Sequence, residues 1–321
     1  MQNYKTVLIT GATGFIGSHL TEYLVEKGFN VIAFDRYNSN NDWGWLENSK
    51  YNNDFQMVLG DIRDYDSISK AMLGCNAVFH LAALIGIPYS FISPLAYIRT
   101  NVEGTYNILE SAKNLEIEQI LITSTSETYG TAQYTPIDEK HPLVGQSPYS
   151  ASKISADQIS ISYHRSFSLP LKIVRPFNIS GPRQLPDAGF VLPRFVHMVM
   201  NDTSPVIYGS GEQIRSFCYM DDAAQGIYKV LTNSNGVNEL YLLKNKLKDF
   251  ITNANLIKNG CLTEKGEYLL SKSYAYGVTD SYMKTFIHLE ALCLDSQSDG
   301  ISNKLDKNKN EYHVDRPLNV W

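Results

Sequence analysis

The sequence has few cysteines and no long apolar run. Its four cysteines, Cys75, Cys218, Cys261 and Cys293, are widely spaced and form no C-x-x-C pair. This spacing argues against a zinc site or a disulfide scaffold and predicts a reducing, cytoplasmic environment. No apolar stretch approaches the roughly 20 residues that span a bilayer, and no basic, apolar leader opens the chain. We therefore expect no membrane span, no secretory signal and no metal site.

Positive charge is not in excess either. The chain has 28 lysine and arginine residues against 33 aspartate and glutamate residues, a formal net charge of -5. Nucleic acid and anionic membranes are therefore not expected partners. A hydrophobic content of 43% and a charged content of 19% are typical of a globular protein. The 321 residues suffice for one large α/β domain, or for a large and a small one.

Short β-branched runs alternate with amphipathic stretches in the first part of the chain. A helix is predicted over 15–27, ended by Gly28. The predicted buried strands cover residues 6–10, 30–34, 55–59, 76–80, 119–123 and 171–176. Continuous apolar strands that alternate with helices predict an α/β fold with a doubly wound parallel sheet of the Rossmann type. Ligands of such a sheet bind at the carboxyl ends of its strands.

The pattern loosens after Pro176. We expect residues 1–177 to form the main domain, with its sheet completed by about 222–243, and residues 178–221 to form a smaller substrate-binding lobe. The lobe is predicted to hold a helix over 192–200 and strands over 205–209 and 215–220. Residues 244–321 are rich in lysine, asparagine and serine and are expected to form an atypical, partly solvated C-terminal segment.

The stretch "TGATGFIG" places Gly11, Gly14 and Gly17 between the first strand and the first helix. Such glycines allow a tight turn, a close approach of a pyrophosphate to the backbone, and phosphate binding at the helix N-terminus. Asp35 ends the second strand, where a carboxylate accepts bonds from both ribose hydroxyls and repels a 2′-phosphate. This favours NAD over NADP, although Arg36 next to it softens the preference.

Two more strand ends extend this cofactor site. "GDIRD" offers Asp61 for the adenine edge, and "HLAA" ends the fourth strand with small residues that can lie against a cofactor. His80 in this stretch is expected to be a packed strand-end residue and not a catalytic one.

"SPYSASK" places Tyr149 and Lys153 four residues apart on a helix that Ser147 is expected to cap. A phenol with a pKa of about 10 is a poor base near neutrality. A lysine ammonium and the positive nicotinamide of NAD⁺ stabilise the phenolate, so Tyr149 is predicted to be the base. The helix follows the fifth strand, at the edge where a doubly wound sheet binds its ligands.

"ITSTSETYG" (122–130) puts one carboxylate, Glu127, among hydroxyls directly after the fifth strand. A surface loop explains it cheaply, and a general base aimed at a substrate explains it better. The second explanation requires the cofactor and the proton carrier described above.

These motifs, with Asn101 in "TNVEGT", Ser124 and "RPFN" (175–178), resemble the extended short-chain dehydrogenases/reductases. Within them, the chain from Lys5 to Leu243 is similar to the nucleotide-sugar epimerase/dehydratase group. The resemblance implies that NAD stays bound through the reaction cycle. It also implies a homodimer formed through helices 95–113 and 148–167.

The resemblance further implies roles for single residues. Thr125 and Tyr149 would contact the 4-hydroxyl of the sugar, whereas Asn178 and Arg215 would bind the nucleotide diphosphate. The predicted catalytic residues are Thr125, Ser126, Glu127, Tyr149 and Lys153. The predicted cofactor-binding residues are Gly11, Gly14, Phe15, Ile16, Gly17, Asp35, Arg36, Asp61, Ile62, Leu81, Ala82, Ala83, Asn101, Tyr149 and Lys153.

The sequence leaves several reactions open after oxidation at C4. A 4,6-dehydratase needs a base for the C5 proton and an acid for the departing 6-hydroxyl. A 4-epimerase needs neither group. In a uronic-acid decarboxylase, the oxidised sugar loses CO₂ instead. The best-known dehydratases of the group have Thr-Asp-Glu, with the aspartate as the acid, where this chain has Thr-Ser-Glu, so Ser126 replaces that acid. Thr-Ser-Glu resembles the decarboxylases and also the 4,6-dehydratases of legionaminic-type pathways.

The wider sequence favours the dehydratase. Residues 36–48, 81–91 and 131–153 resemble the legionaminic-type branch, whereas residues 179–195 are more similar to epimerases or decarboxylases. We expect 4,6-dehydration of a nucleotide-activated hexose or N-acetylhexosamine. The alternatives are a decarboxylase of the UDP-glucuronate type, a 4-epimerase, and a non-catalytic protein that binds NAD and a nucleotide sugar. Residues 244–321 weakly resemble the lead-in to a class I methyltransferase, which predicts a truncated fusion or a disrupted reading frame.

Overall fold

The computed structural model describes residues 5–186, 190–207, 215, 217–232, 240–243, 257–258 and 261–262. The chain forms two compact units. The first comprises Met1–Gln184 and Ser216–Asn245, and the second comprises Leu185–Arg215 and Lys246–Trp321. Most of the predicted C-terminal segment, and the end of the strand expected at 205–209, lie outside the described residues.

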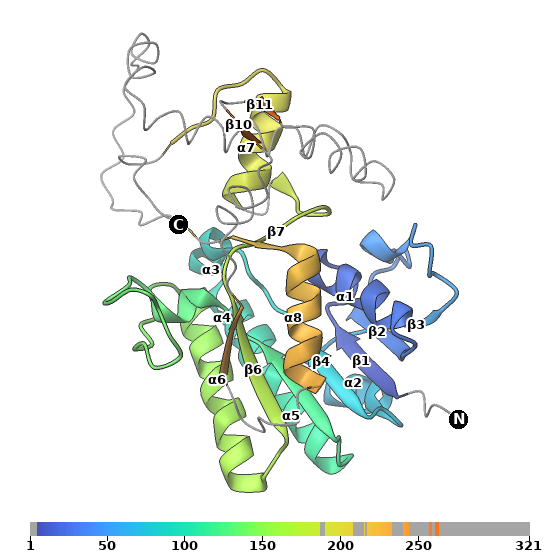
Figure 1. The fold of residues 1–321 in the computed structure, drawn as a ribbon. Helices are drawn as coiled ribbons and strands as arrows, with labels where there is room; N and C mark the ends of the chain where they lie inside the picture. Colours follow the sequence, from blue (N-terminus) through green and yellow to red (C-terminus); the bar gives the residue numbers. More distant parts are fainter. Residues whose placement is uncertain are drawn as a thin grey trace. The chain divides into compact units, whose positions relative to one another are not determined.

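The first unit is built on a seven-stranded sheet with the order β3-β2-β1-β4-β5-β6-β9, and every neighbouring pair in it is parallel (Figure 1). This confirms the predicted doubly wound parallel sheet. The strands are β1 (Thr6–Thr10), β2 (Asn30–Arg36), β3 (Phe55–Gly60), β4 (Ala77–His80), β5 (Gln119–Thr123), β6 (Leu171–Pro176) and β9 (Leu240–Leu243). The strand order reverses between β1 and β4, which is the switch point where such sheets bind ligands.

Helices connect the strands and cover both faces of the sheet (Figure 1). They are α1 (Phe15–Glu26), η1 (Gly44–Leu46), α2 (Tyr65–Met72), α3 (Ile87–Ile92), α4 (Pro94–Tyr97), the π-helix η2 (Ile98–Glu103), α5 (Gly104–Asn114), η3 (Ser126–Tyr129), α6 (Pro148–Phe167) and α8 (Met220–Thr232). Gly28 follows α1 with a φ of 81°, as expected of a helix stop. Ser147 caps α6 in a reciprocal capping box with Ser150, which confirms its predicted role.

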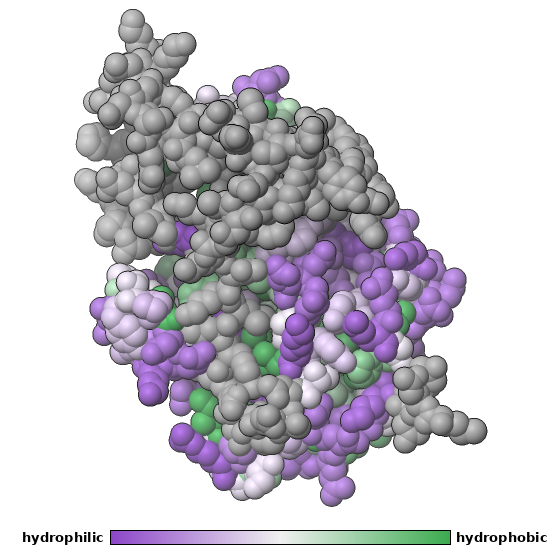
Figure 2. All heavy atoms as spheres, viewed as in Figure 1, coloured by the Kyte–Doolittle hydropathy of each residue, from purple (hydrophilic) through white to green (hydrophobic). Residues whose placement is uncertain are grey.

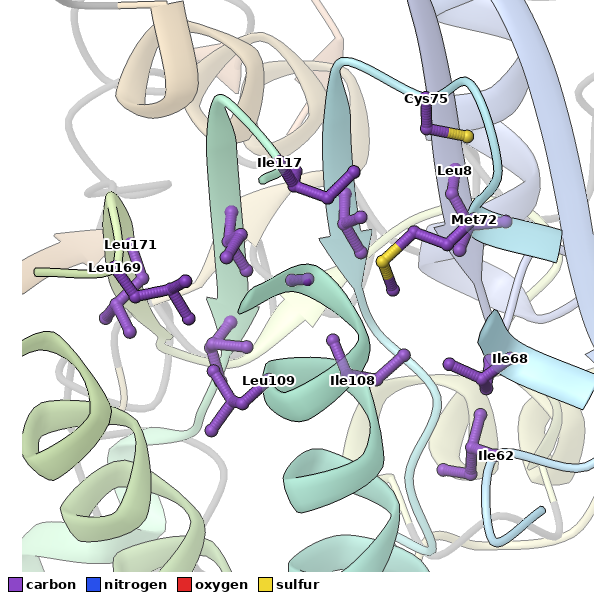
Figure 3. Packing of buried hydrophobic residues seen from close by; sticks show 14 of the residues in the cluster. Leu8, Ile62, Ile68, Met72, Cys75, Ile108, Leu109, Ile117, Leu169 and Leu171 are labelled. Atoms are coloured by element: carbon purple, nitrogen blue, oxygen red, sulfur yellow. The ribbon is translucent and has the colours of Figure 1, made fainter. Parts of the chain in front are cut away.

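Alternating strand residues build two separate cores. Val7 and Ile9 of β1 face a cluster that includes Leu20 of α1 and Ile227 of α8. Leu8 between them points to the other face, into a cluster formed with α2 and α5 (Figure 3). Because both faces of the sheet are buried, most residues of its strands are apolar. The buried Lys172 within β6 donates from Nζ to the carbonyl oxygens of Val230 and Leu231.

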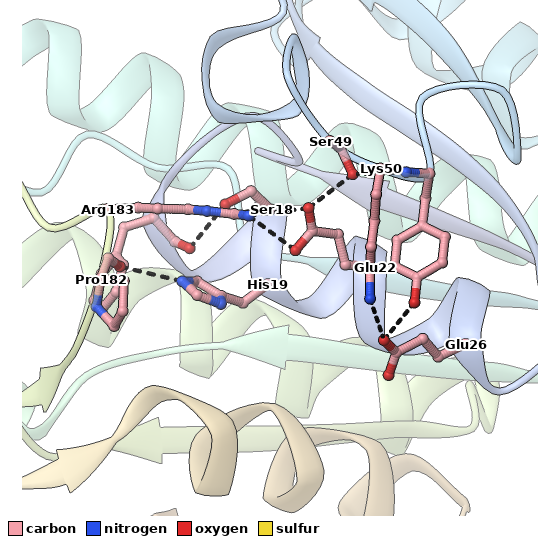
Figure 4. A network of polar contacts seen from close by, with 10 residues as sticks. Ser18, His19, Glu22, Glu26, Ser49, Lys50, Pro182 and Arg183 are labelled. Carbon is pink, nitrogen blue, oxygen red and sulfur yellow. Dashed lines mark hydrogen bonds and ion pairs between the residues drawn. The ribbon is translucent and has the colours of Figure 1, made fainter. Parts of the chain in front are cut away.

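Polar contacts along α1 fix the chain after β7 (Ile179–Ser180) (Figure 4). Arg183 donates from Nη2 to both carboxylate oxygens of Glu22, each at 2.9 Å, and Ser49 Oγ donates to the same carboxylate at 2.7 Å. His19 Nε2 lies 3.1 Å from the carbonyl oxygen of Pro182, and burial lowers the pKa of this histidine. The segment at Pro182 and Arg183 is therefore anchored to α1, just before the chain leaves the first unit after Gln184.

β7 pairs in parallel with β8 (Cys218–Tyr219), so the strand predicted over 215–220 is shorter than expected. In the second unit, α7 (Val191–Met200) matches the predicted helix, and β10 (Ile257–Lys258) pairs antiparallel with β11 (Cys261–Leu262).

Figure 2 shows hydrophilic side chains over most of the described surface in that view, with small hydrophobic patches between them. Within the described part of the chain, no helix combines the length and the apolar character that a membrane crossing requires.

Candidate active site

The glycine turn lies directly against the end of β4. Gly11 has a φ of 72°, and a Cβ on it would lie 2.9 Å from the Cα atom of Ala82. The backbone N–H of Leu81 donates to the carbonyl of Thr10 at 3.2 Å, and the N–H of Ala82 donates to Thr10 Oγ1 at 3.2 Å. Two predicted parts of the cofactor site, the glycine turn and "HLAA", therefore form one surface.

The three glycines meet different surroundings. A Cβ on Gly17 would lie 2.0 Å from the carbonyl oxygen of Gly11, so the protein's own packing excludes a side chain there. Gly14 has an ordinary φ of -75°, and a Cβ on it would meet only Gly11 O, at 3.5 Å. Nothing in the described residues requires a glycine at position 14. It is exposed, it begins α1, and no described side chain caps it, so this cradle fits a pyrophosphate.

Three predicted cofactor residues have packing roles. Phe15 and Ile16 begin α1 and pack against the cluster that contains Ile179 and Met220. Ile62 is buried in the core that α2 and α5 share. Direct contact of these three side chains with a cofactor stays a prediction.

Asp35 lies at the end of β2, beside the glycine turn. Its Oδ2 accepts hydrogen bonds from Thr13 N at 2.8 Å and Thr13 Oγ1 at 2.6 Å, and its Oδ1 accepts one from Arg36 N at 2.6 Å. Each carboxylate oxygen has two lone pairs, so acceptor capacity remains for ribose hydroxyls. The position fits the predicted role.

Asp61 forms an ion pair that the sequence did not indicate. Arg63 donates to its carboxylate from Nε at 3.0 Å and from Nη2 at 2.5 Å. These bonds hold the pKa of Asp61 below its usual value. A contact with an adenine edge stays a prediction for this residue.

Asn101 is buried in the π-helix η2, and its amide is engaged by the protein. It bonds the backbone of Leu84 through both Oδ1, at 2.8 Å, and Nδ2, at 2.9 Å, and Nδ2 also donates to Ser152 Oγ at 2.9 Å. It therefore fixes the segment after β4 against α6. Single-turn π-helices of this kind occur often at functional sites.

The turn η3 carries the predicted residues Ser126 and Glu127, and Thr125 directly precedes it. Thr125 is the N-cap of this turn, and its Oγ1 accepts a hydrogen bond from Glu127 N at 3.2 Å. Tyr149 of α6 is buried, and burial raises its pKa, which the hydrogen bond with Thr125 opposes. The negative charge of Glu127 raises the same pKa further, so Thr125, Glu127 and Tyr149 lie near one another, and their catalytic roles stay predictions.

Lys153 is held at the end of β5. Its Nζ donates to the carbonyl oxygen of Thr123 at 2.7 Å. Burial lowers the pKa of Lys153 itself to about 8, and Asp157 opposes this shift. The action of its ammonium on the pKa of Tyr149 stays a prediction.

The predicted packing role of His80 is confirmed. The side chain is buried, with Nδ1 2.8 Å from Thr10 Oγ1 and Nε2 3.1 Å from Thr105 Oγ1. Burial and the nearby charge of Lys153 lower its pKa to about 3. His80 is therefore neutral at pH 7 and links β1 to α5.

Sequence reasoning missed a buried ion pair behind the catalytic turn. Arg175 of β6 donates from Nη2 to Asp157 of α6 at 2.8 Å, and both side chains are buried. Asp157 follows Lys153 by four residues, on the same helix face, which is the one signal that could have indicated it. It also missed Tyr97, whose ring lies edge-on to Tyr149 at 6.2 Å.

The two predicted substrate-binding residues belong to different units, and their roles stay predictions. Asn178 is exposed, with a φ of 30°, in the first unit, and Arg215 belongs to the second unit. Within the described residues, no group of three or more histidine, cysteine, aspartate or glutamate side chains could hold a metal ion.

A Rossmann sheet with this glycine cradle and a Tyr-x-x-x-Lys helix defines a short-chain dehydrogenase/reductase of the extended, nucleotide-sugar type. The family model for GDP-mannose 4,6 dehydratase matches residues 8–267, and the chain belongs to that family.

Relatives in this family carry out different reactions. The dTDP-D-glucose 4,6-dehydratase of Dictyostelium discoideum is 32% identical over 74% of this chain and 57% of its own length. UDP-glucuronic acid decarboxylase 4 of Arabidopsis thaliana is 33% identical over 70% of this chain and 50% of its own length. The chain thus spans about half the length of these curated relatives. The crystal structure of the Bacillus cereus UDP-glucuronic acid 4-epimerase with UDP-glucuronic acid and NAD has a TM-score of 0.68 and 29% identity, covering 75% of this chain and 78% of that chain.

His80 predicts an acid-dependent loss of stability. Its folded pKa of about 3 lies below its ordinary value of 6.5, so the unfolded chain binds the proton first as the pH falls. The contribution of neutral His80 to the free energy of unfolding is fully present above about pH 6.5. About 2 kcal/mol of this contribution is lost by pH 5. Urea unfolding at pH 7 and pH 5 should show a smaller pH-dependent loss in His80→Gln than in the wild type. The exposed His197→Gln is the control, and equal losses in His80→Gln and the wild type would contradict the assignment.

Proposed function

We propose that the chain catalyses the NAD-dependent 4,6-dehydration of a nucleotide-activated hexose or N-acetylhexosamine through a 4-keto sugar. The observation that carries the proposal is the turn η3, which brings Glu127 and Thr125 to the buried phenol of Tyr149. A carboxylate beside that phenol has a task in dehydration and none in simple 4-epimerisation. Residues 36–48, 81–91 and 131–153 resemble the legionaminic-type 4,6-dehydratases. This resemblance supports a substrate of the kind that this branch uses.

The cofactor is NAD, whose pyrophosphate the cradle of Gly11, Gly14 and Gly17 would hold, while Asp35 would accept hydrogen bonds from its ribose. Bound there, it would supply the acceptor for a hydride from the sugar and the donor that later returns one. Tyr149 takes the proton of the 4-hydroxyl, and Thr125 hydrogen-bonds the phenol and favours its ionised form. Lys153 keeps positive charge one helical turn away on α6.

Glu127 then acts on the 4-keto sugar. The ketone acidifies the C5 proton, and the carboxylate of Glu127 removes it. Loss of the 6-hydroxyl as water needs a proton donor. Ser126 cannot supply one as a carboxylic acid does, so in this proposal the protonated Glu127 or a bound water delivers the proton to the leaving oxygen.

Decarboxylation of a nucleotide-linked uronic acid is the second candidate. The Thr125-Ser126-Glu127 sequence resembles the decarboxylases, and a decarboxylase is among the relatives of the chain. This reaction shares the oxidation at C4 and needs no acid at position 126.

The mass of the product separates these reactions. The protein is incubated with NAD and, separately, UDP-GlcNAc, GDP-GlcNAc and UDP-glucuronate. Loss of water from an amino sugar is expected. Loss of CO₂ from UDP-glucuronate would instead establish a decarboxylase, and an isomer of unchanged mass would establish an epimerase. NAD binding with every substrate left unchanged would overturn the enzymatic proposal.

Glu127→Gln isolates the second step. The variant should catalyse the loss of water from the 4-keto sugar at least about 100-fold more slowly, because a general base accelerates such a step by about 10²–10⁴-fold. Oxidation at C4 should continue, visible as the absorbance of reduced cofactor on mixing with substrate. Thr131→Ala, outside the turn η3, serves as the control. Water loss at the wild-type rate would show that Glu127 is not the base.

We also infer that the chain forms a homodimer through α4, η2, α5 and α6. Apolar side chains on these helices are exposed by about half: Leu95 by 55%, Ile98 by 53% and Phe167 by 53%. An unpaired apolar face on adjacent helices favours self-association.

Light scattering after gel filtration tests the dimer. The wild type should have about twice the 36.1 kDa mass of one chain, and Ile98→Arg should reduce it to one chain, because it places a charge in the apolar face. Leu73→Arg, at an exposed position after α2, should leave the mass unchanged. A monomeric wild type would exclude the dimer.

A further inference from the structure

One buried carboxylate fixes the chain just before the catalytic turn. Asp157 on α6 is fully buried, one helical turn after Lys153 and two turns after Tyr149. Its Oδ2 accepts hydrogen bonds from Arg175 Nε at 3.0 Å and Nη2 at 2.8 Å, and from Ser124 Oγ at 2.9 Å. Ser124 directly precedes Thr125, the N-cap of η3. The carboxylate of Asp157 therefore holds the chain at the start of this turn.

The same ion pair holds the other end of the turn. Arg175 Nη1 donates to the hydroxyl of Tyr129 at 2.9 Å, and the guanidinium carbon lies 4.9 Å from the centroid of that ring. Tyr129 is the last residue of η3 and is fully buried. Its ring stacks on Phe177 and meets His141 edge-on. Glu127 therefore lies on a short turn with both ends tied to one salt bridge.

The carboxylate also acts on the catalytic lysine. Nζ of Lys153 is held by the carbonyl of Thr123, one residue before Ser124. The charge of Lys153 interacts with Asp157 on α6 and with His80 on β4, and His80 is neutral at pH 7. Asp157 is thus the negative charge that keeps the ammonium of Lys153 in place against the cost of burial.

Stability alone does not account for this arrangement. A buried ion pair contributes little net stability compared with apolar residues of the same volume. Here it is also incompletely satisfied, because Asp157 Oδ1 has no hydrogen-bond partner among the described residues. Beyond the ion pair itself, the carboxylate and the guanidinium bond the two ends of the catalytic turn.

We propose that Asp157 and Arg175 are positioning residues: their ion pair fixes the Thr125–Glu127 turn against Tyr149, and Asp157 places a negative charge one helical turn from Lys153. This proposal rests on the proposed function, because the position of the turn matters for turnover only if Thr125 and Glu127 act in the reaction.

Two mild variants test the positioning. Tyr129→Phe and Ser124→Ala each remove one link and leave the ion pair intact. With the nucleotide sugar that the wild type converts, kcat should fall by about tenfold or more in each, since small displacements of catalytic groups have effects of this size. KM and the unfolding midpoint should stay near the wild-type values. Tyr51→Phe, which loses the phenol bond to Glu26 at the far end of α1, is the matched control. Wild-type kcat in both variants would overturn the positioning role.

Asp157→Asn tests the electrostatic role without turnover. The titration of Lys153 is followed by NMR on protein with 13C-labelled lysine, with Lys153→Met to assign the signal. Lys153 should titrate at a lower pH in Asp157→Asn than in the wild type, and the alkaline limb of kcat should move to lower pH with it. Glu22→Gln, which breaks the ion pair with Arg183, should leave the titration unchanged. An unchanged Lys153 titration in Asp157→Asn would overturn this role, even if no nucleotide sugar is converted and the proposed function fails.

A double variant separates positioning from folding. Asp157→Asn leaves the guanidinium of Arg175 buried without its counter-ion and should destabilise the protein. Asp157→Asn combined with Arg175→Met removes both charges and should recover the unfolding midpoint. Its kcat should remain at least about tenfold below the wild type, because the turn has lost both anchors. Recovery of both kcat and the midpoint would show that the pair serves the fold alone. If the double variant does not fold, Tyr129→Phe and Ser124→Ala decide the question.

Discussion

The parallel direction of all seven strands is the constraint on which the site depends. Because helices cover both faces, a polar side chain cannot lie along a strand without a partner, and chemistry is confined to the carboxyl edge. Thr10, Asp35, His80 and Thr123 each lie at the end of one of four strands in the sheet, and each binds a residue of another segment there. The cofactor cradle and the catalytic helix meet at this edge for the same reason.

Behind that edge, buried polar groups fix each catalytic residue from more than one direction. Asn101 ties the segment after β4 to α6, whereas Asp157 and Arg175 tie the turn after β5 to α6 and β6. A buried donor or acceptor is costly when unpaired, so such networks leave few alternative arrangements. The geometry around Tyr149 is therefore set by contacts within the folded sheet unit.

Local signals in the sequence were sufficient for most of the helices and strands, whereas the roles of the site residues stay predictions. The strands 6–10, 119–123 and 171–176 agree with the structure at both ends, because their apolar runs are bounded by polar or turn residues. Ser147 was recognisable as a cap, and Tyr149 and Lys153 follow from helical spacing. The Arg63 and Arg175 ion pairs and the bond from Lys153 to Thr123 were not predicted. Two of these three contacts join residues on different elements, and pairing across elements leaves no periodic pattern in the sequence.

The short ladder between β7 and β8 has an evolutionary consequence. Ile179 pairs with Cys218 and Ser180 with Tyr219, so the chain leaves and re-enters the sheet unit at neighbouring points. The stretch between these two strands is an insertion whose two ends are fixed by the β7–β8 pairing. Its sequence can therefore change, or be exchanged by recombination, while the sheet and its carboxyl edge are retained.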